Sequence, residues 1–254
     1  IIHAAALKHV TIAEYNPMEV IKTNINGANN IVQAAISNNV KKIISLSTDK
    51  AVNPINLYGA TKLASDKLFI AANNIVGKKK CIFSTVRYGN VVGSRGSIME
   101  IFKKLSDSKS NTFPITDKSM TRFWVTLDET VEFVLLSLLR MQGGEIFVPK
   151  IDSINIKDLV PAFNQKAKIK ITGIRPGEKM HEILYSKEDS DNTIEFSNFY
   201  IIKPQIKFTT TKTNYELTHL GEKGKKVKPG TEYNSFNNPS FLSIKELKQL
   251  VKKY

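Results

Sequence analysis

Tyr58 and Lys62 form the motif Y-x-x-x-K. This spacing places both side chains on one face of a helix, one turn apart. A nearby ammonium group stabilises a phenolate, lowers the tyrosine pKa and lets the side chain take a proton from a substrate hydroxyl near neutral pH. The pair therefore suits proton transfer at an alcohol, although a tyrosine and a lysine on a helix surface can share this spacing by chance.

Thr48, Asp49 and Lys50 follow the apolar segment KKIISLS, which is typical of a buried strand. In open α/β sheets, ligands bind at the carboxyl ends of the strands. An acid next to a base would cost desolvation energy there without a structural gain. The sequence therefore predicts a reactive site at this strand end, with a solvated surface pair as the alternative.

The first 150 residues alternate apolar runs with amphipathic stretches, which predicts βα units that form a parallel sheet. The fold class is α/β. Asn16 before Pro17 is a helix start signal, and Thr126-x-x-Glu129 is a capping box. We expect buried strands at 1–5, 42–47, 82–87 and 145–149, and helices at 17–38, 59–74 and 98–105.

After residue 150 the elements become shorter. A second capping box, Ser243-x-x-Glu246, predicts a last helix. The pattern favours a first domain over 1–150, with an insert at about 91–125, and a second lobe with a tail over 151–254. The elements expected in the second part are helices at 155–163 and 177–184 and strands at 168–174 and 199–204.

The composition is typical of a soluble globular protein, with 41% hydrophobic and 24% charged residues. No apolar run has the length needed to cross a bilayer. Cys81 is the single cysteine, so an intramolecular disulfide is excluded, and its apolar setting predicts a buried thiol. A reducing cytoplasm fits these features, and no metal site is predicted.

The net charge of +14 indicates nucleic acid, an anionic membrane surface or an anionic small substrate as partner. The densest run of lysines, 223–228 in GEKGKKVKPG, is flanked by glycine and proline and has no interleaved aromatic residues. A solvated loop explains that run better than a nucleic-acid surface. The charge alone does not choose among the three kinds of partner, although we expect neither nucleic acid nor a membrane.

Several separated motifs occur in a fixed order: HAAALKHV, STDKAVNPINLYGATK, VRYGNVVGSRGS, MTRFW and IRPGEKMHE. Together they resemble the inverting UDP-N-acetylglucosamine 4,6-dehydratases, which are extended short-chain dehydrogenase/reductases. The resemblance covers residues 1 to about 204 and, more weakly, the tail. It implies a Rossmann-like doubly wound parallel sheet with a smaller mixed α/β substrate lobe, in a cytoplasmic homo-oligomer.

The resemblance also implies a reaction. NADP, or alternatively NAD, takes a hydride from C4 of the sugar while Tyr58, assisted by Lys62, removes the hydroxyl proton. Lys50 is then the base at C5, which requires a neutral amine, and Asp49 is the acid at the departing C6 hydroxyl. Related enzymes that retain the C5 configuration carry Asp-Glu at these positions, so Lys50 points to inversion.

The family pattern assigns further binding roles and lies beside the cofactor at His3. A lone histidine in a strand is more often a core residue, so we expect a structural role for His3. Arg122 and Arg175 are expected to bind diphosphate, with surface salt bridges as the alternative. The expected cofactor-binding residues are Ala5, Lys8, Tyr58 and Lys62. The expected substrate-binding residues are Asn90, Val91, Ser94, Arg95, Ser97, Arg122, Arg175 and Glu178.

The chain opens with IIHAAA and contains no glycine-rich dinucleotide loop, because GSRGS lacks the G-x-G-x-x-G spacing. We therefore expect a longer parent protein, and we expect this chain alone to bind cofactor poorly and to be inactive. For the parent, the resemblance implies a first step towards pseudaminic acid and flagellin glycosylation. The alternatives are a retaining dehydratase or 4-epimerase for capsule synthesis, and a non-catalytic nucleotide- or nucleic-acid-binding protein.

Overall fold

The computed structural model describes residues 1–206 and 213–253, which form two compact units. Unit 1 consists of Ile1–Tyr88, Val131–Lys150 and Ile183–Tyr233, and unit 2 of Gly89–Thr130, Ile151–Glu182 and Asn234–Tyr254. The elements become shorter after residue 150, and at this point the chain passes from unit 1 to unit 2. Residues 183–233, which the sequence suggested for the second lobe, belong to unit 1.

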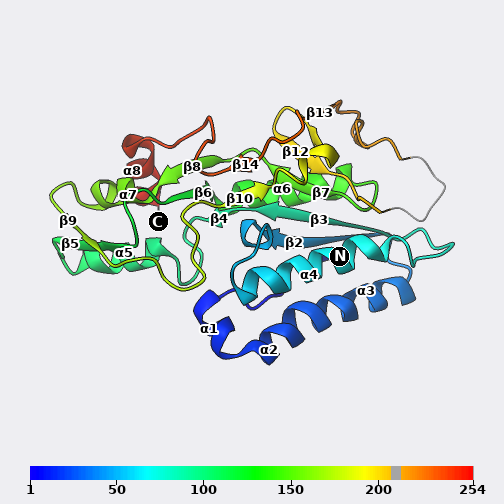
Figure 1. Cartoon of the computed structure of the whole chain (residues 1–254), viewed down its shortest axis with the longest axis horizontal. Helices are drawn as coiled ribbons and strands as arrows, with labels where there is room; N and C mark the ends of the chain where they lie inside the picture. Colours follow the sequence, from blue (N-terminus) through cyan, green and yellow to red (C-terminus); the bar gives the residue numbers. More distant parts are fainter. Residues whose placement is uncertain (207–212, 254) are drawn as a thin grey trace. The chain divides into compact units, whose positions relative to one another are not determined.

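Unit 1 is built on a seven-stranded sheet in the order β1-β2-β3-β7-β12-β11-β13 (Figure 1). The first four strands are parallel and are β1 (Ile2–His3), β2 (Lys42–Thr48), β3 (Ile82–Tyr88) and β7 (Ile146–Pro149). An antiparallel extension adds β12 (Phe199–Ile202), β11 (Thr193–Glu195) and β13 (Lys225–Lys226). The lysine run expected to be a loop thus contains a short, exposed edge strand.

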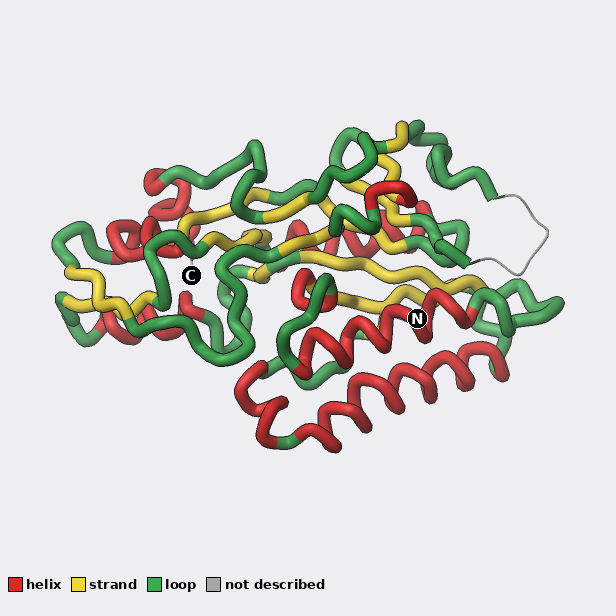
Figure 2. Tube along the Cα trace, in the orientation of Figure 1, coloured by secondary structure: helices red, strands yellow, loops and turns green. Residues whose placement is uncertain are grey.

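Helices cover both faces of this sheet, and alternate strand residues pack on opposite sides. Ile43 and Phe83 pack with Phe69 against α3 and α4, whereas Ile44 and Val86 pack towards α6. Figure 2 shows α3 and α4 as long helices beside the strands. The helices of this part are α1 (Val10–Tyr15), α2 (Pro17–Ile21), the π-helix η1 (Lys22–Asn26), α3 (Gly27–Ser37), the 3-10 helix η2 (Asp49–Ala51), α4 (Leu57–Ala72), α6 (Leu127–Arg140) and the 3-10 helix η3 (Ser190–Asn192).

The expected buried strand at 1–5 is wrong in its extent. β1 contains only Ile2 and His3, and Ile1 and Ile2 are 46% and 43% exposed. β1 lies at the edge of the sheet and pairs with β2 alone among the described strands, so few residues shield it from solvent. His3 is nevertheless buried, as is the Cys81 thiol.

Unit 2 contains a three-stranded sheet, β4-β6-β8, and a parallel pair, β5-β9. Phe102, Phe113 and Trp124 form the centre of its core together with Leu159 and Leu247. The elements are β4 (Asn90–Val91), α5 (Ile98–Asp107), β5 (Thr112–Ile115), β6 (Thr121–Val125), β8 (Asp152–Asn155), α7 (Ile156–Phe163), β9 (Lys168–Ile171) and α8 (Ile244–Lys253). Two further short strands, β10 (Ile183–Tyr185) and β14 (Tyr233–Asn234), fall where the chain passes from one unit to the other.

Both predicted capping boxes are confirmed. The Thr126 hydroxyl donates to Glu129 Oε2 at 2.7 Å, and the Ser243 hydroxyl donates to Glu246 Oε2 at 2.7 Å. The helix expected at 177–184 is wrong: Gly177 has a φ of 76°, and the Met180 carbonyl accepts from the Thr121 amide of β6 at 3.1 Å. These features replace the first helical turns by a bend that leads into β10.

None of the helices within residues 1–206 and 213–253 combines the length and the apolar content that a bilayer crossing requires.

Candidate active site

The start of α4 is seated on the turn that follows β2. Asn56 caps the helix, with its Oδ1 accepting from the Gly59 amide at 2.7 Å. A Cβ atom at Gly59 would lie 2.1 Å from the Lys50 carbonyl oxygen, so only glycine permits this approach. The glycine after Tyr58 therefore explains how one helix turn reaches the strand end that carries Asp49 and Lys50.

Four side chains meet at this point in unit 1. Lys50 Nζ donates to Asp49 Oδ1 at 3.0 Å, and Thr48 Oγ1 donates to the same oxygen at 2.9 Å. The Thr48 hydroxyl is also hydrogen-bonded to the Tyr58 side chain. This hydrogen bond lowers the pKa of Tyr58, so it favours the phenolate. The structure thus links Tyr58 to Asp49 through Thr48.

Asp49 is enclosed within this group. Its side chain is fully buried, and its second carboxylate oxygen, Oδ2, has no hydrogen-bond partner among the described residues. Lys50 is more open, with 22% of its side chain exposed. Buried polar atoms are normally paired, so Oδ2 is placed to accept from, or donate to, a ligand hydroxyl.

The Tyr58 phenol is held in its neutral form. Burial raises the pKa of Tyr58 to about 12, and the Lys50 charge and the Thr48 hydrogen bond oppose this effect. The sequence predicted that Lys62 would lower the pKa of Tyr58. In the structure the nearby cation with that effect is Lys50.

Lys62 is 3% exposed, and its ammonium group makes no hydrogen bond or ion pair with residues 1–206 and 213–253. Burial lowers the pKa of Lys62, and the Asp66 carboxylate raises it. His3 packs on Phe69 with 5.4 Å between ring centroids, and burial followed by the Lys62 charge lowers its pKa. His3 thus packs as a core side chain, in line with the structural role expected of it.

Ala5 and Lys8 lie between β1 and α1, and both are exposed. The structure does not bring either into the network around Asp49. Asn24, for which no role was predicted, is buried and fixes this segment. Its Oδ1 accepts from the Leu7 amide at 2.8 Å, and its amide donates to Thr61 Oγ1 at 3.0 Å. Thr48 also had no assigned role. A hydroxyl residue directly before Asp-Lys was the available signal for it.

In unit 2, Asn90 and Val91 form β4, and a turn carries Ser94, Arg95 and Ser97 towards α5. Arg95 is exposed. Asn90 Oδ1 and Ser97 Oγ are inaccessible and have no hydrogen-bond partner among the described residues. These two atoms have the capacity to bind a ligand that the protein itself does not use.

Arg122 is 6% exposed and engaged within unit 2. Its Nη1 donates to the Thr121 carbonyl at 2.7 Å, and its Nη2 lies 3.6 Å from Glu178 Oε1. Arg175 is exposed, and its backbone amide donates to Glu178 Oε2 at 3.4 Å. The structure therefore brings Arg122 and Glu178 together as an ion pair.

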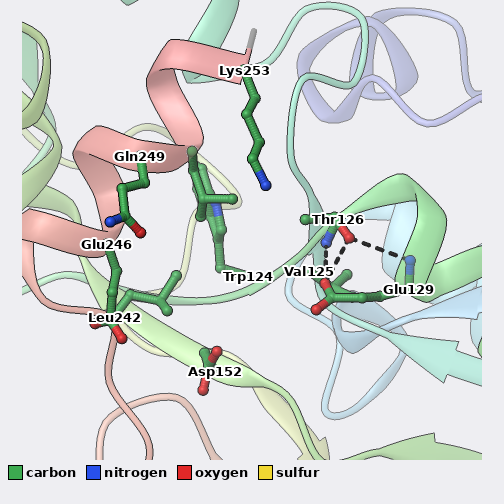
Figure 3. A pocket seen from close by; sticks show the side chains of 10 residues that line it. Trp124, Val125, Thr126, Glu129, Asp152, Leu242, Glu246, Gln249 and Lys253 are labelled. Atoms are coloured by element: carbon green, nitrogen blue, oxygen red, sulfur yellow. Dashed lines mark hydrogen bonds between the residues drawn. The ribbon is translucent and has the colours of Figure 1, made fainter.

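A hollow of about 190 Å³ lies in unit 2, and none of the residues that the sequence assigned to binding lines it (Figure 3). Trp124 and α8 form its walls, and the Thr126–Glu129 capping box lies at its side. In the described ranges, 1–206 and 213–253, no group of three or more histidine, cysteine, aspartate or glutamate side chains could hold a metal ion.

The Rossmann-like sheet and the Thr48, Tyr58 and Lys62 side chains define an extended short-chain dehydrogenase/reductase. A family model described as polysaccharide biosynthesis protein matches residues 1–204, and the chain belongs to this family. The resemblance and the fold class predicted from the sequence are both confirmed.

Named relatives are similar over nearly the whole chain. The UDP-N-acetylglucosamine 4,6-dehydratase (inverting) of Campylobacter jejuni is 58% identical over 99% of this chain and 75% of its own length. The UDP-glucose 4-epimerase of Rickettsia bellii is 40% identical over 99% of the chain and 73% of its own length.

Two crystal structures agree with the fold. Pen from Bacillus thuringiensis has a TM-score of 0.85 and 33% identity, covering 100% of this chain and 75% of that one. DesIV, a dTDP-glucose 4,6-dehydratase from Streptomyces venezuelae, has a TM-score of 0.64 and 21% identity, covering 71% and 62%. The second likeness concerns the fold alone.

Proposed function

We propose that this chain belongs to an enzyme that dehydrates UDP-N-acetylglucosamine at C4 and C6 with inversion at C5. The product is a UDP 4-keto-6-deoxy-N-acetyl-hexosamine. The observation that carries the proposal is the buried Asp49 carboxylate, which is bonded to Lys50 and linked through Thr48 to Tyr58. The similarity to the C. jejuni enzyme supports the same substrate.

The cofactor of the proposal is NADP, with NAD as the alternative. Lys62 fits it, because a buried ammonium group without a partner in the described chain can donate to ribose hydroxyls. When bound, the nicotinamide accepts a hydride from C4 and returns it at C6. Ala5 and Lys8 remain proposed cofactor contacts. We also propose that this chain by itself binds the cofactor poorly and is inactive.

Tyr58 takes the C4 hydroxyl proton in the first step of the proposal. Its pKa of about 12 in the absence of ligands is high for a base at neutral pH, so added positive charge is required. Lys50 already lowers the pKa of Tyr58. A bound nicotinamide cation would act in the same direction. Thr48 can pass a proton along the hydrogen bonds that it makes.

Asp49 and Lys50 carry the elimination. The reaction requires a neutral amine at C5 and a carboxylic acid at the C6 hydroxyl. In the ion pair, the proton that the reaction needs on Asp49 is carried by Lys50 Nζ. Its transfer to Asp49 Oδ1, 3.0 Å away, produces both required forms. Lys50 then takes the C5 proton while Asp49 gives its proton to the leaving hydroxyl, which departs as water.

The substrate contacts proposed in unit 2 are those of the family resemblance. Asn90 and Ser97 each offer an unpaired buried oxygen, which supports them as ligands. Arg122 would have to share its guanidinium between Glu178 and a diphosphate. The proposed set is Asn90, Val91, Ser94, Arg95, Ser97, Arg122, Arg175 and Glu178.

A direct assay tests the function. Because this chain by itself is proposed to be inactive, the full-length parent protein is incubated with UDP-N-acetylglucosamine and NADP in heavy water, and the product is analysed by NMR. We expect a 4-keto-6-deoxy sugar with one deuterium at C5 and the inverted configuration. An unchanged sugar, or a product without deuterium at C5, contradicts the proposal.

A second candidate is a 4-epimerase, which the 40% identity to the R. bellii epimerase favours. It would give a C4 epimer that keeps its C6 hydroxyl, and a retaining dehydratase would give the opposite C5 configuration. A non-catalytic nucleic-acid-binding protein would instead show strongly salt-dependent DNA binding and no nucleotide-sugar binding. We further propose a cytoplasmic homo-oligomer that acts in pseudaminic acid synthesis for flagellin glycosylation.

A further inference from the structure

Asp66 follows Lys62 by one turn of α4, so Tyr58, Lys62 and Asp66 occupy one face of the helix. The proposed reaction gives Asp66 no role. Asp66 is 1% exposed and Lys62 is 3% exposed. A buried carboxylate and a buried ammonium group are therefore neighbours next to the proposed catalytic tyrosine.

The Asp66 carboxylate is fixed through one oxygen. Oδ2 accepts from Ser47 Oγ at 2.7 Å and from Arg87 Nη2 at 3.4 Å. Oδ1 is inaccessible and has no hydrogen-bond partner among the described residues. Ser47 directly precedes Thr48 on β2. The carboxylate is thus tied to the strand that presents Asp49, while part of its charge is not compensated by hydrogen bonds.

Arg87 does not neutralise Asp66 by itself, because its guanidinium is shared. Nη1 donates to the Leu184 carbonyl at 3.1 Å and lies 4.0 Å from Asp189 Oδ2. Arg87 is also only 4% exposed. Burial raises the pKa of Asp66, and two buried cations, Arg87 and Lys62, lower it.

The other titratable groups near Lys62 do not supply a negative charge at neutral pH. His3 of β1 has a pKa lowered by burial and by Lys62, so it is neutral. Tyr58 is neutral because its pKa is about 12. Burial lowers the pKa of Lys62, and Asp66 is the group that raises it.

We propose that Asp66 is a positioning residue that keeps Lys62 as an ammonium ion on the α4 face that carries Tyr58, and that Arg87 supports this role by keeping Asp66 ionised. An uncharged Lys62 would lose one of its donors and the positive charge it offers to a bound cofactor. The role of Lys62 in cofactor binding rests on the proposed function. The charge relationship itself is a property of the folded chain.

The test follows the titration of Lys62 by NMR, using lysine labelled with ¹³C at Cε and an assignment from the Lys62→Met variant. In Asp66→Asn we expect the Lys62 titration to move to lower pH by about one unit or more, which is about tenfold in the ratio of amine to ammonium. In Arg87→Gln we expect a smaller move in the same direction, because Arg87 lowers the pKa of Asp66 against the effect of burial. A Lys62 titration that is unchanged in both variants overturns the proposal.

Two further variants separate charge from packing. Asp66→Glu keeps the carboxylate, so the Lys62 titration should return towards its original position. Ser47→Ala removes a hydrogen bond and no charge, so its shift should be smaller than that of Asp66→Asn. A lowered melting temperature in Asp66→Asn with an unmoved Lys62 titration shows a structural role alone and overturns the proposal. If Asp66→Asn does not fold, the Lys62 shift to lower pH in Arg87→Gln decides.

Cofactor binding gives a second readout. In the full-length parent protein, the dissociation constant of NADP is measured by calorimetry over a range of pH. Its rise with increasing pH should begin at a lower pH in Asp66→Asn than in the unchanged protein. Equal pH dependence in the two proteins contradicts the proposal. A protein that lacks dehydratase activity but shows the Lys62 shifts would refute the proposed function and leave the role of Asp66 supported.

Discussion

Lys50 Nζ lies 3.0 Å from Oδ1 of Asp49, the residue directly before it in the chain. Neighbouring side chains point to opposite faces of an extended strand, so this contact requires the 3-10 turn η2 at the end of β2. The contact places a base and an acid within one proton transfer of each other. Three predictions follow from this group and its neighbours, and a fourth concerns His3.

Asp49→Asn removes the acid and keeps the shape of the side chain. We expect the rate of dehydration to fall at least about 100-fold, because general acid catalysis contributes that much or more. Oxidation at C4 should persist, and single-turnover absorbance of the reduced nicotinamide would record it. Asp128→Asn, at an exposed residue in the first turn of α6, is the matched control. Equal loss of both steps would contradict the assigned role.

Lys50→Met removes the base while keeping an unbranched side chain. We expect no deuterium at C5 when the reaction is run in heavy water. The pKa of Tyr58 should also rise, because the Lys50 charge lowers it. Lys67→Met, at an exposed position of α4, should behave like the unchanged protein. Deuterium at C5 in the Lys50 variant would show that another group is the base.

Thr48→Ala removes the hydroxyl between Tyr58 and Asp49. This hydrogen bond lowers the pKa of Tyr58, so its loss should raise that pKa and move the acidic limb of the pH profile of kcat/KM to higher pH. Thr48→Ser keeps a hydroxyl and should restore the profile. A uniform loss of rate with an unmoved acidic limb would mean that Thr48 acts on the fold rather than on Tyr58.

The sequence predicted the parallel part of the fold well, because short apolar runs that alternate with amphipathic helices are local signals. It placed Thr48, Asp49, Lys50 and Tyr58 near one another for the same reason, since a strand end and the following helix are close in the chain. The helix expected at 177–184 was wrong because a long-range bond from Thr121 to Met180 competes with the helical pattern.

Other features of the site depend on burial, which no local pattern reveals. The motif Y-x-x-x-K suggested that Lys62 controls the pKa of Tyr58, whereas the structure gives that effect to Lys50. Lys62 lies one helix turn from Tyr58, and Lys50 lies before the loop. Which of the two acts on the Tyr58 phenol depends on how the chain folds back at Gly59. Asp66 was missed because a carboxylate on a helix is normally exposed.

His3 provides a test of stability against pH. It is buried on Phe69, and its pKa lies below the ordinary value of 6.5 because of burial and the charge of Lys62. The folded protein therefore binds this proton less readily than the unfolded chain does. The stability linked to His3 is complete above about pH 6.5 and is lost as the pH falls through the folded-state pKa.

The measurement compares urea unfolding of the protein and its His3→Gln variant between pH 7.5 and pH 5. One proton changes the free energy of unfolding by at most about 1.4 kcal/mol per pH unit, and the variant should lose part of the acid-side slope. Some slope remains because His181, hydrogen-bonded to Thr121 at 2.8 Å, also has a lowered pKa. His219→Gln, at an exposed position, should keep the full slope. Identical slopes in the protein and the His3 variant would show that a proton on His3 does not oppose folding, and that Lys62 has no unfavourable interaction with it.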